Sequence, residues 1–119
     1  MSHTHLPHNH GEHNDALMEK LSKTEDFQKV SDVFRQLSDG TRVRIFWILC
    51  HCEECVINLS AMMEMSSPAL SHHLKLLKSA GLIVSRREGK EVYYKAAETP
   101  QVHMLHDMIE AQMDISCPQ

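Results

Sequence analysis

Hydrophobic residues recur at three- and four-residue steps through much of the chain, which is the pattern of amphipathic helices. The first such stretch begins at Asp15 and runs to Leu37, so it predicts one or two helices. Residues 38–40 interrupt the pattern, and Thr41 is expected to cap a further helix that reaches Cys50. Apolar residues lie on nearly every side of that helix, so we expect it to be the most buried helix of the protein.

The middle of the chain predicts two helices in close succession. A short helix is expected over about 57–65, followed by a tight turn. Ser67 and Pro68 then form a strong helix start, since serine caps helix N-termini and proline fits the first helical position. This second helix is predicted to end before Gly81, a residue suited to a left-handed C-terminal position. Its buried stripe is predicted to be Leu70, Leu74 and Leu77.

The last third of the chain predicts a hairpin and a final helix. Residues 82–87 and 91–96 are expected to form two strands around a turn at residues 88–90. After Pro100 a last helix is expected to run to about Ser116. Its apolar positions are Val102, Leu105, Met108, Ile109 and Met113. Because a small domain leaves this stripe little to pack against, we expect it to contact a partner chain.

The composition is that of one ordinary globular domain. The chain has 119 residues, of which 42% are hydrophobic and 24% charged. No apolar run approaches the roughly 18 residues of a membrane span, and the N-terminus lacks the order of a signal peptide. Three of the four cysteines crowd into residues 50–55, where they are poorly placed for a secreted disulfide framework. We therefore expect a cytoplasmic protein without membrane contact, with its domain over residues 15–119.

Charge is distributed unevenly along the chain. The net charge is −4, yet residues 66–95 carry six basic and two acidic side chains, a local charge of +4 against −8 elsewhere. A basic block in an acidic chain is typical of a domain with one surface that faces an anion. No glycine-rich phosphate loop, nucleophile elbow or His-Glu-x-x-His motif occurs, so we do not expect an enzyme.

The order of the predicted elements is that of a winged helix-turn-helix, a mainly α fold with a β-hairpin wing. Ser71, His72 and Lys75 lie opposite the leucine stripe, where such groups can reach phosphates and base edges in a major groove. The basic hairpin would contact the DNA backbone or minor groove. The predicted DNA-binding residues are Ser66, Ser67, Pro68, Ser71, His72, His73, Lys75, Lys78, Arg86, Arg87 and Lys90. A winged-helix module that binds protein or stores metal, without binding DNA, is a distant alternative.

Histidine is concentrated at the N-terminus. Five of the ten histidines fall within the first 13 residues, and nothing there is periodic. We therefore expect residues 1–14 to form a flexible arm, whose composition is typical of metal binding. The arm histidines are His3, His5, His8, His10 and His13.

Three motifs carry a family resemblance. Residues 37–45 read LSDGTRVRI, residues 67–77 read SPALSHHLKLL, and AGLI at 80–83 is followed by REGK at 87–90 and a Tyr-Tyr pair. Together they resemble the ArsR/SmtB family of dimeric bacterial repressors, which leave DNA on binding metals or on thiol oxidation. The resemblance covers roughly residues 27–113. It implies a homodimer through the N- and C-terminal helices, whose two recognition helices read a palindromic operator in double-stranded DNA.

The resemblance also implies a sensing site. The family's thiol site, Glu-Leu-Cys-Val-Cys-Asp, falls on residues 53–58, where Cys55 is kept but Ile57 and Asn58 replace the second cysteine and the acid. Candidate substitutes upstream are Cys50, His51 and Cys52. In that site type the N-terminal arm of one subunit can reach the cluster of the other. Thiolate and imidazole together suit Zn²⁺, and Cd²⁺ or another thiophilic metal where thiolates dominate.

Two other sensing arrangements remain open. A second family site, Asp-x-His with His-x-x-Glu/Asp, loses both histidines here, although His103 and His106 share one face of the last helix beside Asp107 and Glu110. Alternatively, Cys50 and Cys117 resemble in position a cysteine pair through which some members sense oxidants or reactive sulfur. We therefore predict a repressor released by a metal ion at a Cys/His site, with thiol-based sensing as the alternative.

Overall fold

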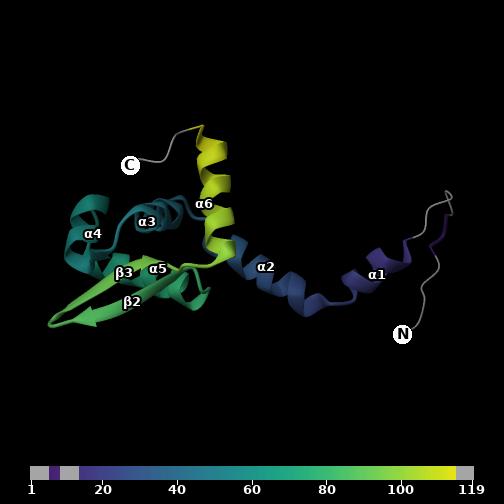
Figure 1. The fold of residues 1–119 in the computed structure, drawn as a ribbon, viewed down its shortest axis with the longest axis horizontal. Helices are drawn as coiled ribbons and strands as arrows, with labels where there is room; N and C mark the ends of the chain where they lie inside the picture. Colours follow the sequence, from purple (N-terminus) through teal and green to yellow (C-terminus); the bar gives the residue numbers. More distant parts are fainter. Residues whose placement is uncertain (1–5, 9–13, 115–119) are drawn as a thin grey trace. The chain divides into compact units, whose positions relative to one another are not determined.

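The chain forms two compact units, residues 1–32 and residues 33–119, of which the computed structural model describes residues 6–8 and 14–114. In chain order the elements are α1 (Asp15–Leu21), α2 (Thr24–Gln36), α3 (Gly40–His51), β1 (Glu54–Cys55), α4 (Val56–Met63), α5 (Ser67–Ser79), β2 (Ile83–Glu88), β3 (Glu91–Ala96) and α6 (Pro100–Met113) (Figure 1). Among the helices of the described residues, none has the length and apolar character needed to cross a bilayer.

The first unit contains α1 and most of α2, so the predicted one or two helices form as two. The break follows Leu21, where the Ser22 hydroxyl donates to the carbonyl of Glu19 at 2.6 Å. Apolar side chains of both helices are half or more exposed in the single chain. They are Leu17, Leu21, Phe27 and Val30. Burial among the described residues of this unit therefore does not explain the hydrophobic pattern that predicts its helices.

The core of the second unit is built around α3. Of its 12 residues only Gly40 and Arg44 are exposed, which confirms it as the most buried helix. Ile45 and Phe46 have no exposed surface. The leucine stripe of α5 is also buried, as predicted, and it packs in the same cluster. Those residues are Leu70, Leu74 and Leu77. Burial of this stripe turns the opposite face of α5 outwards.

Two helix caps differ by one or more residues from the sequence prediction. Asp39, rather than Thr41, caps α3, because its extended backbone lets the carboxylate accept the N–H of Thr41 at 2.7 Å. Ser66, rather than Ser67, caps α5 through the N–H of Ala69. Pro68 therefore occupies the second helical position, where its missing N–H is equally harmless. Gly81 has the predicted left-handed conformation, with φ of +77°.

The sheet has three antiparallel strands in the order β1–β3–β2. Strands β2 and β3 form the predicted hairpin, called the wing below, with Gly89 at φ of +62° in its turn. The sequence did not predict β1, because two residues are too few to show an alternating pattern. Its pairs are Glu54 with Tyr94 and Cys55 with Tyr93. Strand β1 therefore joins the segment after α3 to the wing.

The last helix differs from expectation in the partner of its apolar stripe. Leu105 and Ile109 are only 8% and 9% exposed and, with Val102, belong to the core cluster of this chain. The expectation that this stripe contacts a partner chain is therefore wrong for these three residues. Met108 and Met113 of the predicted stripe stay exposed, at 41% and 54%, and so does Met104, at 70%. The helix ends at Met113, about three residues before the predicted Ser116, because Asp114 takes the left-handed conformation with φ of +52°.

Candidate nucleic-acid interface and metal-ligand cluster

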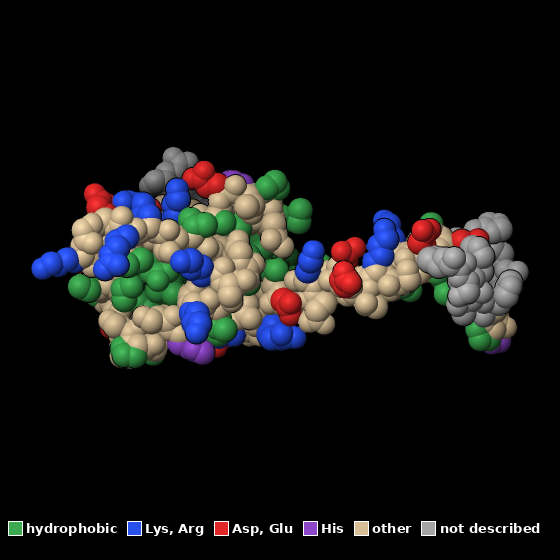
Figure 2. Space-filling model, turned by 90° about the horizontal axis from the view of Figure 1, so that it is seen from below, with side chains coloured by type: hydrophobic (Ala, Val, Ile, Leu, Met, Phe, Trp, Pro, Cys, Tyr) green, Lys and Arg blue, Asp and Glu red, His purple; other side chains and the backbone are tan. Residues whose placement is uncertain are grey.

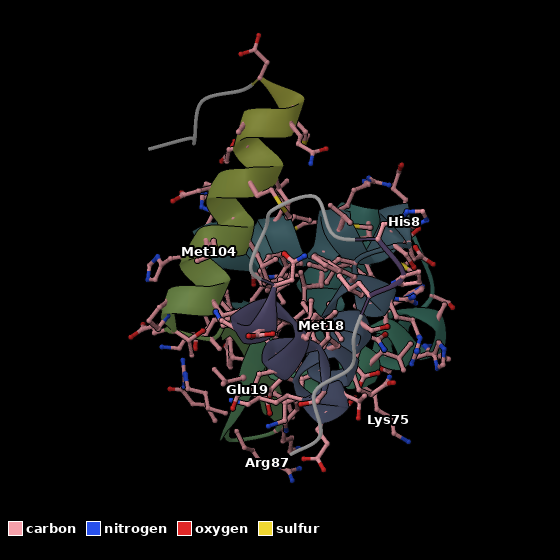
Figure 3. All side chains as sticks on the ribbon, turned by 90° about the vertical axis from the view of Figure 1, so that its right-hand side faces the viewer. His8, Met18, Glu19, Lys75, Arg87 and Met104 are labelled. Carbon is pink, nitrogen blue, oxygen red and sulfur yellow. The ribbon has the colours of Figure 1, made fainter. Side chains whose placement is uncertain are left out.

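Helix α5 presents a polar face opposite its buried leucines. Ser71, His72 and Lys75 are all exposed, and so is the first turn of the helix from Ser66 to Pro68. Figure 3 shows Lys75 and Arg87 directed outwards at the same edge of the molecule. Hydroxyl, imidazole and ammonium groups on one exposed helical face are suited to contacts with base edges and phosphates. Their role in DNA binding stays a prediction.

Three other predicted DNA-binding residues make contacts inside the fold. His73 is half-buried, and its Nδ1 lies 3.3 Å from Nη1 of Arg42 in α3. Lys78 donates to the Ser85 hydroxyl of β2 at 2.7 Å. The hydroxyls of Ser67 and Ser60 lie 3.2 Å apart and link α5 to α4. These contacts fix α5 against α3, α4 and the wing.

Arg86 of the wing is held by carboxylates. Its guanidinium donates twice to Glu53, at 2.7 and 3.0 Å, and once to Glu88 at 2.7 Å, and it lies over the ring of Tyr93. These bonds lower the pKa of Glu53 and raise the pKa of Arg86 above its ordinary value. Arg86 therefore joins the segment after α3 to the wing, and a DNA contact would require it to exchange a carboxylate for a phosphate.

The remaining basic residues give this side of the second unit its positive charge. Lys75, Lys78, Arg87 and Lys90 are all exposed. Seen from below the view of Figure 1, Lys and Arg side chains are spread over the surface of α5 and the wing (Figure 2). The wing itself carries Glu88 and Glu91 among these cations. The local excess of positive charge predicted from the sequence therefore lies on an exposed surface.

The three cysteines at the end of α3 and just after it have different environments. Cys50 is half-buried, Cys52 exposed and Cys55 buried. Partial burial and the nearby charge of Glu54 raise the pKa of Cys52, which disfavours its reactive thiolate form. Among the described residues, no three-donor group includes any of these thiols. The prediction that they form the sensing site stays untested, since Cys117, His3, His5, His10 and His13 lie outside the described residues.

One convergent group of metal-binding side chains does occur among the described residues, and it consists of His51, His106 and Glu110, called the triad below. Nε2 of His106 lies 3.1 Å from Nε2 of His51. Glu110 Oε1 lies 3.0 Å from His106 Nε2 and 3.4 Å from His51 Nε2. The same oxygen accepts the indole N–H of Trp47 at 3.3 Å. The triad joins the end of α3 to the middle of α6.

Sequence reasoning finds the members of the triad separately but not their combination. It places His51 with the cysteines and His106 with His103, and it includes Glu110 only as a neighbour of His106. The spacing of His106 and Glu110 puts them on one helical face, but 55 residues separate His106 from His51. His103 is exposed and does not belong to the triad. Beside the triad lies an open cavity of about 380 Å³ whose lining includes Cys50, His51, Cys52, Lys95, His103 and His106.

Comparison with known proteins identifies the family. The sequence pattern described as "Bacterial regulatory protein, arsR family" matches residues 39–85. Over 90 residues the chain is 37% identical to the arsenic resistance transcriptional regulator ArsR1 of Pseudomonas putida, and the match covers 72% of this chain and 70% of that protein. The chain belongs to the arsR family. This confirms the resemblance seen in the motifs, and the family is one of regulatory proteins, not of enzymes.

Two further proteins are similar to this chain, one in sequence and one in fold. A cadmium resistance transcriptional regulatory protein CadC homolog of Staphylococcus aureus is 47% identical over 66 residues, which cover 55% of this chain and 54% of that protein. The chain thus spans about half the length of that relative. The homodimeric winged helix-turn-helix DNA-binding domain of Mb0332 from Mycobacterium bovis has 30% identity and a TM-score of 0.71 over 77% of this chain and 84% of that one. The predicted winged helix-turn-helix fold is therefore confirmed.

Proposed function

We propose that this arsR-family chain is a DNA-binding transcriptional repressor. The observation that carries the proposal is the exposed polar face of α5, which the buried leucines hold outwards beside a basic wing. In this arrangement α5 enters the major groove, where Ser71 and His72 reach base edges and Lys75 reaches a phosphate. Arg87 and Lys90 contact the backbone beside the groove. Ser71 and His72 then determine which DNA sequence is bound, while the basic residues supply affinity for any DNA backbone.

The proposed active form is a homodimer on a palindromic operator. Apolar side chains that each unit leaves exposed support a second copy as the partner. They are Phe27 and Val30 in the first unit, and Phe34, Met104 and Met108 in the second. The similar domain of Mb0332 is itself homodimeric. Two copies would present two recognition helices, and two-fold symmetry in the protein requires a matching symmetry in the DNA.

The proposed signal is a metal ion that releases the repressor from DNA. The Staphylococcus aureus and Pseudomonas putida relatives are named for cadmium and arsenic resistance, and this chain has thiol and imidazole groups at the end of α3 and just after it. The alternative signal is an oxidant or reactive sulfur species acting on Cys50 and Cys117. If the Cys117→Ser variant still leaves DNA when the signal is added, the signal is the metal. If Cys50→Ser and Cys117→Ser each abolish this release from DNA, the signal acts through thiol chemistry.

Fluorescence anisotropy of labelled genomic fragments from the source bacterium tests the DNA-binding proposal. The full chain should bind some fragments about 10³- to 10⁷-fold more tightly than unrelated duplex. Ser71→Ala and His72→Ala should each reduce that preference, by about 1–3 kcal/mol where the side chain bonds a base edge. Lys75→Ala should weaken binding to every duplex. Lys29→Ala, which removes an exposed cation from α2, serves as the control. Equal binding by all of these variants would contradict the proposed surface.

A further inference from the structure

The geometry of the triad differs from that of an ordinary hydrogen-bonded network. All three close approaches use the same atom of each residue, namely Nε2 of His51, Nε2 of His106 and Oε1 of Glu110, at separations of 3.0, 3.1 and 3.4 Å. A network has no need for this, because Glu110 could bond each imidazole through a different carboxylate oxygen. Three donor atoms gathered within 3.4 Å of one another are what a metal ion requires.

The separations also match the size of a tetrahedral zinc site. Zn²⁺ binds imidazole nitrogen and carboxylate oxygen at about 2.0–2.2 Å, so two ligands of one tetrahedron lie about 3.3–3.5 Å apart. The triangle formed by the triad therefore needs to widen by only a few tenths of an ångström. Trp47 donates to the ligating oxygen of Glu110, the kind of outer hydrogen bond that orients a ligand.

We infer that His51, His106 and Glu110 bind a borderline divalent cation, Zn²⁺ in the first place, and that the ion joins α3 to α6 within one chain. Two imidazoles and a carboxylate suit Zn²⁺, Co²⁺ or Ni²⁺ better than soft ions that prefer thiolates. The neighbouring cavity, which His51 and His106 help to line, has room for a water molecule as the fourth ligand. The side chains of the triad are 11–18% exposed, so the cavity gives the ion its access.

The position of His51 gives the bound ion a path to the DNA-binding surface. His51 is the last residue of α3, and Glu53, two residues later, pairs with Arg86 of the wing. Strand β1 then pairs with β3, while Arg42 of α3 contacts His73 of α5. A shift of the end of α3 towards α6 therefore reaches both the wing and α5. This regulatory consequence rests on the proposed function, whereas the metal site itself does not.

Zn²⁺ affinity and Co²⁺ absorption of the full chain test the inference without DNA. Competition with a chromophoric chelator should reveal a site that Glu110→Gln and His106→Gln each weaken by more than the about 10- to 100-fold effect of removing an outer hydrogen bond. Both variants should also bind one Co²⁺ ion fewer per chain, seen as the loss of its visible absorption bands. Asp114→Asn, which removes an exposed carboxylate just beyond α6, is the matched control and should bind as the wild type. His103→Gln should also bind as the wild type, which separates the triad from a His103–His106 site.

Several outcomes would overturn the inference. They are wild-type Zn²⁺ affinity in both Glu110→Gln and His106→Gln, an equal loss in His103→Gln, or loss of the site only when Cys50, Cys52 and Cys55 are all replaced by serine. Circular dichroism of each variant without metal shows whether the fold is kept, and the near-isosteric Glu110→Gln is the variant chosen to keep it. DNA binding of the metal-free wild type is measured separately. Its absence would refute the proposed function and leave the Zn²⁺ result to decide the site.

Discussion

Replacing Arg87 and Lys90 together by alanine removes two exposed cations from the wing, and we expect the salt dependence of DNA binding to become less steep. Each neutralised phosphate contributes about 0.9 to the slope of log K against log salt. A dimer has two wings, so about four phosphates are no longer neutralised and the slope should fall by about 3.6. Between about 50 and 200 mM salt, the wild-type affinity should therefore fall about 150-fold more than that of the variant.

The assay is fluorescence anisotropy of an operator-length duplex at a series of salt concentrations. Lys20→Ala with Lys23→Ala removes the same charge from exposed positions in and after α1, and its slope should equal that of the wild type. Ser71→Ala should lower specific affinity at every salt concentration without changing the slope, because a serine releases no counterion. A wing variant with the wild-type slope would refute the assignment of Arg87 and Lys90 to phosphates.

Three further predictions concern packing, pairing and thiol reactivity. Leu105→Ala should lower the free energy of unfolding, measured with urea, by about 2–5 kcal/mol. Met104→Glu on the exposed side of α6 should leave that free energy nearly unchanged and shift sedimentation towards the monomer. A larger loss of stability in Met104→Glu than in Leu105→Ala would contradict the placement of this helix. Because Arg86 lowers the pKa of Glu53 below its ordinary 4.5, the stabilisation from this pair is complete above about pH 4.5 and is lost as pH falls through the lowered value. Arg86→Ala should remove that part of the acid dependence of Tm, and an unchanged acid profile would refute the pairing. Because the pKa of Cys52 is raised, mass spectrometry should find it alkylated by iodoacetamide more slowly than a free cysteine near neutral pH, and faster alkylation would contradict the environment described for it.

Elements whose residues form one continuous pattern could be predicted from the sequence. The leucine stripe of α5 and the left-handed Gly81 both follow local rules of spacing and conformation, and the structure agrees with them. The predicted caps are wrong because two polar residues compete at each helix start, and the choice between Ser66 and Ser67 depends on backbone angles rather than composition. Strand β1 is too short to show any period.

Contacts between distant residues could not be predicted in the same way. The apolar pattern of α6 is the same whether Leu105 packs in the core of its own chain or on a partner chain, so its burial here depends on tertiary structure. The triad is a stronger example, since nothing in the spacing of the sequence directs His51 towards Glu110 rather than towards the adjacent cysteines. Charge, in contrast, was informative, because the basic block around α5 and the wing was visible from the sequence alone.

Selection of binding sites from a pool of random duplexes tests the central claim, sequence-specific DNA recognition through α5, most directly. The metal-free full chain should enrich one palindromic sequence whose half-sites are about 10 base pairs apart, or a multiple of that. The Ser71→Ala/His72→Ala variant should enrich it weakly or not at all. Enrichment of no sequence by the wild type, or of the same sequence to the same degree by the variant, would contradict the account.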